Sequence, residues 1–508
     1  MTSNRSSSLT ATAPQPSLLR FAPIDRLRAL RDVRAVRAAA LLTGVLLAVF
    51  LVQLPVLGHY FFGDDFWPLA DSAAHSTPSY IRRLFLLQDP TPNWRFLPGL
   101  VYLGAYRSFG LNPMPFLLAG LVVHTATCGL VFHFVRRAAG SDWPAVLAAA
   151  FFGLTAAHSS TLGQVTAFDN VLAGFFVMLA LVCLYEALDG EALRWWLPAS
   201  VAAFALAIAS NDAAAAVAPV FGGLVLWRTA GDGAWWRDRR AWTRVVLLSA
   251  PYAVIGATAL ASLGACRCTA AADMYAFGGN VPKNLWIFTG RLLYPVGTDY
   301  PSLGLAHEVA GPIVVAVAIV VLLRGPALAR LAVLFLACAL TPFLFIDWVV
   351  APRHLYLAAI PFSILSALLI AQLSRAGARL TPALPALLAA LSLGVIGLYG
   401  WQTIEQNAVV GSATDDWRTL VAGLQDVGVP PGASVVVVGG PLTDEIWQDV
   451  LPSVSEVLWD DVRLQIVPNA AQICGEPGRR TFVLDYDAGR YTRPAVISDS
   501  GASCAPPG

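Results

Sequence analysis

Three aspartates lie at sites where a membrane protein rarely tolerates charge. Asp64 and Asp65 stand side by side in "FFGDDFW", after a long apolar segment, and Asp169 opens another apolar segment in "QVTAFDNVLAG". Burying carboxylates costs free energy, so ionisable residues at a membrane edge are functional candidates. One carboxylate can act as a general base while another orients the site or binds a metal ion. We therefore predict catalytic roles for all three. The alternative for Asp64 and Asp65 is a solvated turn with aromatic anchors at the interface. The alternative for Asp169 is a position at a helix N-terminus, where the helix dipole favours a carboxylate.

Two arginines suit a substrate that carries phosphate, and three further polar residues lie near the same apolar segments. Arg95 lies in "NWRFLPG", and Arg353 and His354 lie in "APRHLYLAAIP". A guanidinium keeps its charge and grips phosphate oxygens with two parallel hydrogen bonds. His158 and Asp212 stand at the starts or ends of neighbouring apolar segments. We predict that these five residues bind substrate. Snorkelling to the interface is the alternative for each arginine, and a polar helix end is the alternative for His158.

The composition identifies the class of protein. Of 508 residues, 57% are hydrophobic and 13% are charged, and the mean hydropathy is +0.63. Soluble domains carry about 25% charged residues, so the chain is expected to be a polytopic membrane protein. The net charge of +1 gives no reason to expect a nucleic-acid partner.

Apolar stretches of about 20 residues predict about eleven membrane spans. Their expected positions are near 38–57, 113–135, 143–161, 169–187, 195–211, 213–229, 245–264, 309–324, 329–346, 354–373 and 381–401. The arginine clusters all fall on one side of these spans, and the positive-inside rule makes that side cytoplasmic. An odd number of spans then places the C-terminus outside. The expected location is the plasma membrane.

Three regions follow from this pattern. Residues 1–37 are expected to form a cytoplasmic basic tail, 38–401 the transmembrane domain, and 402–508 a small external α/β module of a workable domain size. The fold class is therefore all-α and polytopic, with this module added. Disulfide pairing is left open among four cysteines: Cys266, Cys268, Cys474 and Cys504.

The polar residues that positive-inside sorting does not explain gather on the outer face. This asymmetry favours an outward-facing active site over a charged path through the membrane. These residues are Asp64, Asp65, Asp71, Arg95, His158, Asp169, Asp212, Arg291, Asp299, Asp347, Arg353 and His354.

A string of motifs resembles the GT-C superfamily of polytopic glycosyltransferases. The likeness is strongest to protein O-mannosyltransferase-like enzymes and the transmembrane-and-tetratricopeptide O-mannosyltransferases. "GDDF" resembles their acidic pair in the first outer loop. "NWRFLPGLVYLGAYRSFGLNPMPFLLAGLVVH" resembles a "YRPL" element followed by "FGLNPxxFHxxNxxLH" and keeps Arg95 and His124. "HSSTLGQVTAFDNVL" resembles "HPExVxWISGRxDLL" and keeps His158 and Asp169.

Two more elements follow in the same order. Asn211 and Asp212 stand where those enzymes have "KE", and "RHLYL", starting at Arg353, resembles "RYLYLPS". The likeness covers roughly 55–365. The chain departs from the pattern at Trp94 and Phe96 of the "YRPL" element, and no tetratricopeptide repeat follows.

The resemblance implies a GT-C-like fold and transfer of a sugar from a polyprenyl-phosphate donor to a hydroxyl, with inversion. It implies that Asp64 is the base and that Arg353 or Arg95 stabilises the departing phosphate. The expected partners are this lipid donor, membrane lipid, and an envelope glycan, lipid or protein acceptor. No cofactor is certain, and a divalent metal ion is left open.

Two other functions remain as alternatives. One is a transporter or flippase for a lipid-linked sugar, which would favour inverted repeats and polar groups at mid-membrane depth. The other is a catalytically degenerate GT-C-like subunit. The identities of the sugar and the acceptor, and the oligomeric state, are left open.

Overall fold

The computed structural model places most of the chain. It describes residues 22–86, 95–190, 193–230, 239–265, 275–294, 305–347, 351–426, 428–443, 447–459, 461–469, 473, 479–487, 490–491 and 495–497. The chain forms two compact units, Met1–Gly44 and Val45–Gly508. All eight predicted site residues lie in the second unit. The four cysteines whose pairing was left open lie outside the described residues.

Within the described residues, eight helices are long and apolar enough to cross a membrane. A helix pair bent by 43°, formed by α6 and the segment of η3 and α7, makes a ninth if it counts as one span. The expected all-α polytopic class is thus confirmed. The eight are α1 (Ala22–Gln53), α5 (Met114–Ala139), α8 (Phe168–Asp189), α9 (Leu193–Ser210), α11 (Arg239–Ala265), α15 (Ala327–Leu344), α16 (Tyr356–Gly377) and α17 (Ala383–Gln425). The bent pair comprises α6 (Asp142–Gly153), η3 (Ala156–His158) and α7 (Ser159–Gly163).

The remaining two expected spans, near 213–229 and 309–324, correspond to shorter apolar helices. The Asn211 side chain caps a 3-10 helix, η4 (Asp212–Val217), so α10 (Ala218–Ala230) has only 13 residues. The apolar part of α14 (Leu305–Arg324) covers Val309–Arg324. Eight or nine spans among the described residues therefore replace the expected eleven.

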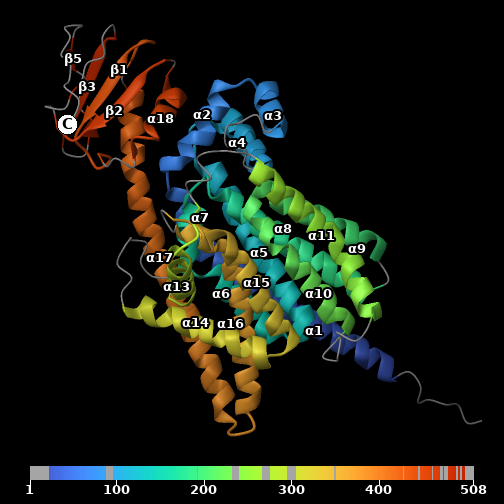
Figure 1. Ribbon diagram of the computed structural model, residues 1–508. Coiled ribbons are helices and arrows are strands. Elements are labelled where there is room, and N and C mark those ends of the chain that lie inside the picture. Colours follow the sequence, from blue (N-terminus) through green and yellow to red (C-terminus); the bar gives the residue numbers. More distant parts are fainter. Residues whose placement is uncertain are drawn as a thin grey trace, which may run out of the picture. The chain divides into compact units, whose positions relative to one another are not determined.

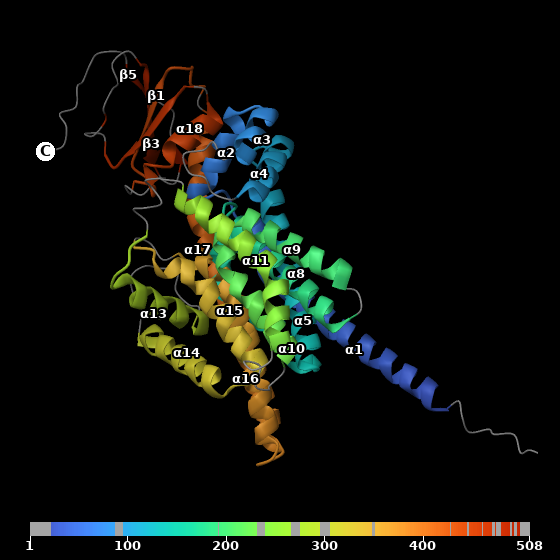
Figure 2. The ribbon, with the colours of Figure 1, turned by 45° about the vertical axis from the view of Figure 1, so that its right-hand side comes forward.

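Close helix packing surrounds the bent pair. Helix α16 packs against α6 and α8, and α5 packs against both of these helices as well. A Cβ atom on Gly174 of α8 would lie 2.7 Å from the Tyr356 ring of α16. Small residues let membrane helices approach in this way. Beside this group, α13 (Asn280–Leu293) pairs with α14 (Figure 2).

Short helices and the β-sheet share one end of the second unit (Figure 1). The segment after α1 forms η1 (Leu54–Gly58), η2 (Gly63–Asp65), α2 (Phe66–Ala74) and α3 (Thr77–Leu86), and α4 (Phe96–Phe109) follows. A further 3-10 turn, η6 (Pro352–Leu355), precedes α16.

The C-terminal module is a small α/β structure, as expected. Its strands run in the order β2-β1-β3-β4, with β1 parallel to β2 and β3, and with β5 antiparallel to β3. Val435, Val436 and Val437 of β1 are fully buried. The elements are β1 (Ser434–Val438), α18 (Leu451–Leu458), β2 (Arg463–Val467), β3 (Thr481–Asp487), β4 (Arg490–Tyr491) and β5 (Ala495–Ile497).

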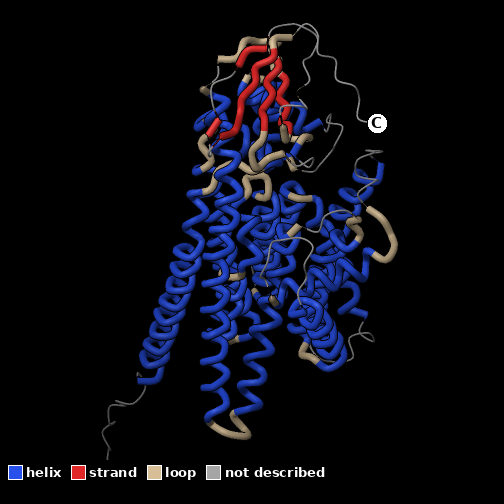
Figure 3. Tube along the Cα trace, turned by 90° about the vertical axis from the view of Figure 1, so that its left-hand side faces the viewer, coloured by secondary structure: helices blue, strands red, loops and turns tan. Residues whose placement is uncertain are grey.

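Helix α17 connects the sheet to the membrane helices. It runs unbroken from Ala383 to Gln425 and leads directly to the strands (Figure 3). The expected domain boundary at residue 401 falls inside this helix and stays a prediction.

Candidate active site

The candidate active site is built around a short loop, residues 164–167, that joins α7 to α8. The hydroxyl of Tyr102 in α4 donates to the carbonyl oxygens of Val165 and Thr166, at 3.1 and 3.0 Å. Burial raises the pKa of Tyr102 well above its ordinary value, and the nearby carboxylates of Asp169 and Asp65 add to this effect. The hydroxyl therefore stays protonated and fixes the loop.

Asp65 ties the segment between α1 and α2 to this loop. Its Oδ1 accepts from the backbone nitrogen and the hydroxyl of Thr166, at 2.7 and 2.8 Å. Its Oδ2 accepts from the backbone nitrogen of Phe62 at 2.9 Å. The residue is fully buried, and this burial raises its pKa to about 6, with the hydrogen bonds opposing the rise. These contacts fix the turn that carries Asp64.

Asp64 points to a different partner. Its Oδ2 lies 3.1 Å from Nη2 of Arg353, and Nη1 of the same guanidinium donates to Oε1 of Gln164 at 3.2 Å. The exposed fractions of the two charged side chains are 33% for Asp64 and 28% for Arg353. A partly exposed carboxylate thus lies beside a partly exposed guanidinium. The guanidinium is held by two partners, Asp64 and Gln164.

A second ion pair stands at the start of α8. Nη1 of Arg95 lies 3.1 Å from Oδ2 of Asp169, whose side chain is 3% exposed. The backbone and side-chain nitrogens of Asn170 donate to Oδ1 of Asp169, each at 2.6 Å, and the Asn211 amide donates to Oδ2 at 3.2 Å. The negative charges of Asp169 and, more weakly, Asp212 raise the pKa of Arg95.

The two histidines pack against aromatic rings. The imidazole of His354 stacks on Phe343, with ring centroids 4.7 Å apart. His158 is fully buried against His124, Phe152 and Tyr356, and neither of its ring nitrogens has a hydrogen-bond partner. Their substrate-binding roles stay predictions.

The structure thus places four of the eight predicted residues in two ion pairs. Asp64 with Arg353, and Asp169 with Arg95, flank the 164–167 loop, and Asp65 accepts hydrogen bonds from Thr166 of that loop. Sequence reasoning missed Gln164 and Thr166. Both lie in "GQVTAF", a polar interruption between His158 and Asp169 that does not identify the distant partners of either side chain.

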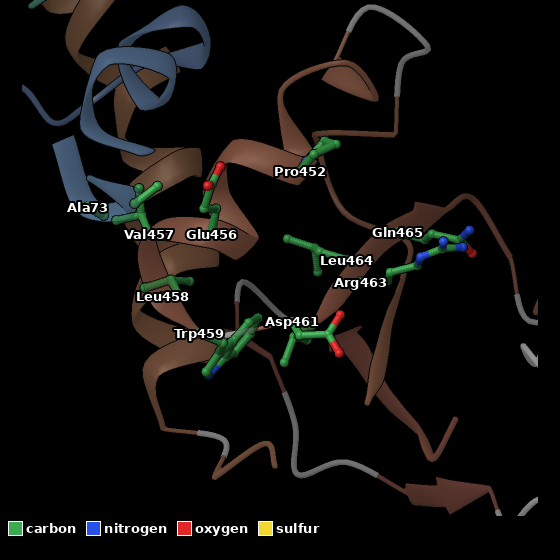
Figure 4. A pocket seen from close by; sticks show the side chains of 12 residues that line it. Ala73, Pro452, Glu456, Val457, Leu458, Trp459, Asp461, Arg463, Leu464 and Gln465 are labelled. Atoms are coloured by element: carbon green, nitrogen blue, oxygen red, sulfur yellow. The ribbon is translucent and has the colours of Figure 1, made fainter. Parts of the chain in front are cut away.

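Two other features bear on the site. Among the described residues, no group of three or more His, Cys, Asp or Glu side chains could hold a metal ion. A cleft of about 750 Å³, here called the C-terminal cleft, lies between the end of α2 and the α18–β2 region, and Trp459, Glu456 and Leu464 line it (Figure 4). None of the eight predicted site residues lines this cleft.

Comparisons with solved structures identify the fold. Two crystal structures of ArnT from Cupriavidus metallidurans are similar to this chain, each at 15% identity. The one bound to undecaprenyl phosphate has a TM-score of 0.51, covering 92% of this chain and 99% of its own. The apo structure has a TM-score of 0.52, covering 93% and 100%.

A third structure is more distant. Archaeal oligosaccharyltransferase AglB from Archaeoglobus fulgidus, in complex with an inhibitory peptide and a dolichol-phosphate, has a TM-score of 0.47 at 11% identity. The match covers 86% of this chain and 65% of AglB. No family model matches the sequence, and a search of curated proteins found no match. The protein O-mannosyltransferase-like subfamily stays a prediction. The chain is a multi-pass membrane protein with a GT-C-like fold.

Proposed function

We propose that this protein is a membrane glycosyltransferase that transfers a sugar from a polyprenyl-phosphate donor to a hydroxyl acceptor. The observation that carries the proposal is the Asp64–Arg353 pair, in which an accessible carboxylate lies 3.1 Å from an accessible guanidinium. Both belong to a multi-pass membrane protein whose fold is similar to that of an undecaprenyl-phosphate-bound protein. A lipid phosphate arrives from the bilayer, so a site at the helix ends suits it.

The proposed chemistry is a single displacement. The acceptor oxygen forms a bond to the anomeric carbon while the bond from that carbon to the phosphate oxygen breaks. The electron pair stays on the departing phosphate, and the acceptor proton passes to Asp64. Attack opposite the leaving group inverts the anomeric centre. A positioned base of this kind contributes about 10²–10⁴ in rate.

Arg353 and Arg95 would stabilise the charge that grows on the phosphate. A guanidinium binds two phosphate oxygens in its plane, and preorganised charge of this kind is worth about 3–4 kcal/mol in comparable sites. Nη2 of Arg353 donates to Oδ2 of Asp64. A bound phosphate would compete for this nitrogen and release the carboxylate toward the acceptor, so we propose that the donor binds first.

We further propose that this end of the helices faces away from the cytoplasm. Arg137 and Arg228 lie with Asp189 at the opposite end of α8 from Asp169. Clustered arginines mark the cytoplasmic ends of membrane helices.

The test uses the full chain in lipid nanodiscs. Undecaprenyl phosphate is expected to bind, and undecaprenol, which lacks the phosphate, is expected to bind far more weakly. Arg353→Gln should lose the preference for the phosphate, whereas Arg137→Gln at the other end should keep it. Equal binding of both lipids by the unmodified protein would refute the phosphate site.

Turnover is tested with undecaprenyl-phosphate-linked hexoses and pentoses added together with an envelope fraction as acceptor. Release of undecaprenyl phosphate with labelled sugar on an acceptor supports a transferase. Movement of the intact donor across a vesicle membrane without release would instead identify a transporter. Binding with neither outcome would indicate a degenerate subunit.

A further inference from the structure

The turn that carries Asp64 has an unusual backbone. Gly63 has φ of +46°, a left-handed conformation that strongly favours glycine. A Cβ atom on this residue would lie 2.8 Å from Cζ3 of Trp447, so the indole ring covers the glycine directly. Trp447 belongs to the C-terminal module, at the start of the turn that leads to α18. The module therefore touches the residue immediately before Asp64.

Aromatic rings from the C-terminal region flank both sides of this turn. Trp447 meets the ring of Phe62 edge to face, with centroids 5.2 Å apart. Trp417, near the end of α17, is fully buried, 5.4 Å from the ring of Phe66 and 5.4 Å from Trp447. Aromatic pairs at these separations contribute about 0.5–1.5 kcal/mol each beyond their burial. The turn that contains Asp64 and Asp65 is thus held on both sides, at Phe62 before it and at Phe66 after it.

The chain leading into the turn is anchored to the same helix. The backbone nitrogen of Tyr60 donates to the Thr414 hydroxyl at 3.0 Å. Arg418 donates from Nη2 to the carbonyl of Gly58 at 2.6 Å, and its guanidinium lies 5.6 Å from the centre of the Tyr60 ring. These contacts fix the path of the chain before the turn, and Trp447 covers the turn itself.

We infer that Trp447 is a positioning residue that holds in place the turn that carries the Asp64 carboxylate, an inference that rests on the proposed function. Asp65 is fixed by its own three hydrogen bonds, but Asp64 reaches Arg353 only if Gly63 keeps its left-handed conformation. The indole ring fills the space into which Gly63 would move. A displacement of about 1 Å at a reacting group can cost 10²-fold in rate, so a remote tryptophan can govern the reaction.

The first measurement is independent of activity. Hydrogen exchange of the full chain in nanodiscs reports on the amides of Phe62 and Asp65, which donate to Asp65 Oδ2 and to the Phe62 carbonyl respectively. Trp447→Ala should make exchange in this turn roughly tenfold faster, because local opening becomes easier. Trp447→Phe keeps an aromatic ring and should give an intermediate rate.

Trp459→Ala is the matched control. Trp459 is a partly buried tryptophan of the same module, but it lines the C-terminal cleft (Figure 4). Its removal should leave exchange in the turn unchanged. Equal exchange in Trp447→Ala and Trp459→Ala would overturn the inference. The Phe variant keeps this test valid if the Ala variant fails to fold.

The second measurement is turnover of the undecaprenyl-phosphate-linked sugar. In Trp447→Ala, release of undecaprenyl phosphate should slow by roughly tenfold or more, because the carboxylate is misplaced. Affinity for undecaprenyl phosphate should change by less than about twofold, since Arg353 keeps Gln164. Faster exchange with unchanged turnover would overturn the positioning role. If the unmodified protein turns over no donor, the proposed function fails, and the exchange result still decides whether Trp447 holds the turn.

Discussion

The two ends of α8 carry similar charges in different surroundings. At its start, Asp169 lies 3.1 Å from Arg95. In its last turn, Glu186 and Asp189 lie 3.0 and 2.9 Å from Arg137, and Arg228 also pairs with Asp189. Distance alone does not separate the two clusters.

Burial of the carboxylates does separate them. The Asp169 side chain is 3% exposed, whereas those of Glu186 and Asp189 are 22% and 33% exposed. Carboxylates near a helix C-terminus are unfavourable, and the arginines there offset this effect, which is a structural role. Asp169 is also held by the neutral amides of Asn170 and Asn211. The comparison teaches that burial and fixed neutral donors, more than the ion pair, distinguish Asp169 from the carboxylates at the other end of α8.

The largest effect is expected for Asp64→Asn. The amide has nearly the same shape but cannot take a proton, so release of undecaprenyl phosphate should slow by about 10²–10⁴. Membrane insertion and the unfolding temperature should be unchanged, because the side chain is partly exposed. Asp189→Asn, at the other end, is the control and should keep full turnover. Full activity in Asp64→Asn would remove Asp64 from the role of base.

Arg353→Lys is expected to have the next largest effect. The ammonium keeps the charge but loses the planar fork that reaches both Asp64 and Gln164. Affinity for undecaprenyl phosphate should weaken by roughly tenfold to a hundredfold. The same change at Arg228, in the other cluster, should leave this affinity unaltered. Wild-type affinity in Arg353→Lys would leave snorkelling as the role of Arg353.

Asp169→Asn should slow turnover by an intermediate factor, roughly ten to a hundred. The variant keeps a hydrogen-bonding oxygen but removes the charge that orients Arg95, and misplaced groups lose rate on this scale. If the pair acts as one unit, adding Arg95→Gln should slow the reaction little further. Independent, multiplying losses in the double variant would show that the two residues do not act together.

The order of the helices could be predicted from the sequence, but their lengths could not. Each expected span contains a helix, yet the run near 213–229 begins with a capped 3-10 turn, because the Asn211 side chain accepts a hydrogen bond from the backbone nitrogen of Ala213. Hydropathy does not detect such local side-chain capping. The expected span 381–401 likewise covers only the first part of α17, because charged residues such as Glu405, Asp415 and Asp416 follow it in the same helix.

The charged members of the site could be predicted because charge is rare in an apolar chain. The neutral members could not: Gln164 and Thr166 are ordinary in composition, and their importance comes from the fold that brings α7, η2 and η6 together. Trp447 is separated from Gly63 by most of the chain, so no local pattern connects them. His158, predicted to bind substrate from its place near a helix break, lies buried among aromatic rings, and its role stays a prediction.

Asp65→Asn should affect the pH dependence of stability more than the rate. The pKa of Asp65 in the folded protein, about 6, lies above its ordinary value of 3.8, so the folded state favours the protonated carboxyl. Its contribution to stability is therefore complete below about pH 4 and is lost as the pH rises through about 6. The unfolding temperature of the unmodified protein should fall across this window, and the Asn variant should lack this part of the fall. If the unfolding temperatures of both proteins depended on pH in the same way, this would contradict a buried Asp65 carboxyl with a raised pKa.

The smallest effect is expected for Arg137→Gln. This variant is also the most direct test of the comparison between the two ends of α8. Arg137 and Arg95 are matched, with side chains 44% and 46% exposed and partners on the same helix. If exposure of the arginine governed its importance, Arg95→Gln and Arg137→Gln would behave alike.

Removing Arg137 leaves partly hydrated carboxylates, so the free energy of unfolding should change by less than about 1 kcal/mol and turnover should be unaltered. Removing Arg95 leaves a carboxylate that is 3% exposed without its cation, and both quantities should fall further. Thermal unfolding and donor turnover, measured on both variants, test this difference. If Arg95→Gln and Arg137→Gln lost the same stability and the same turnover, the charges at the two ends of α8 would have the same role.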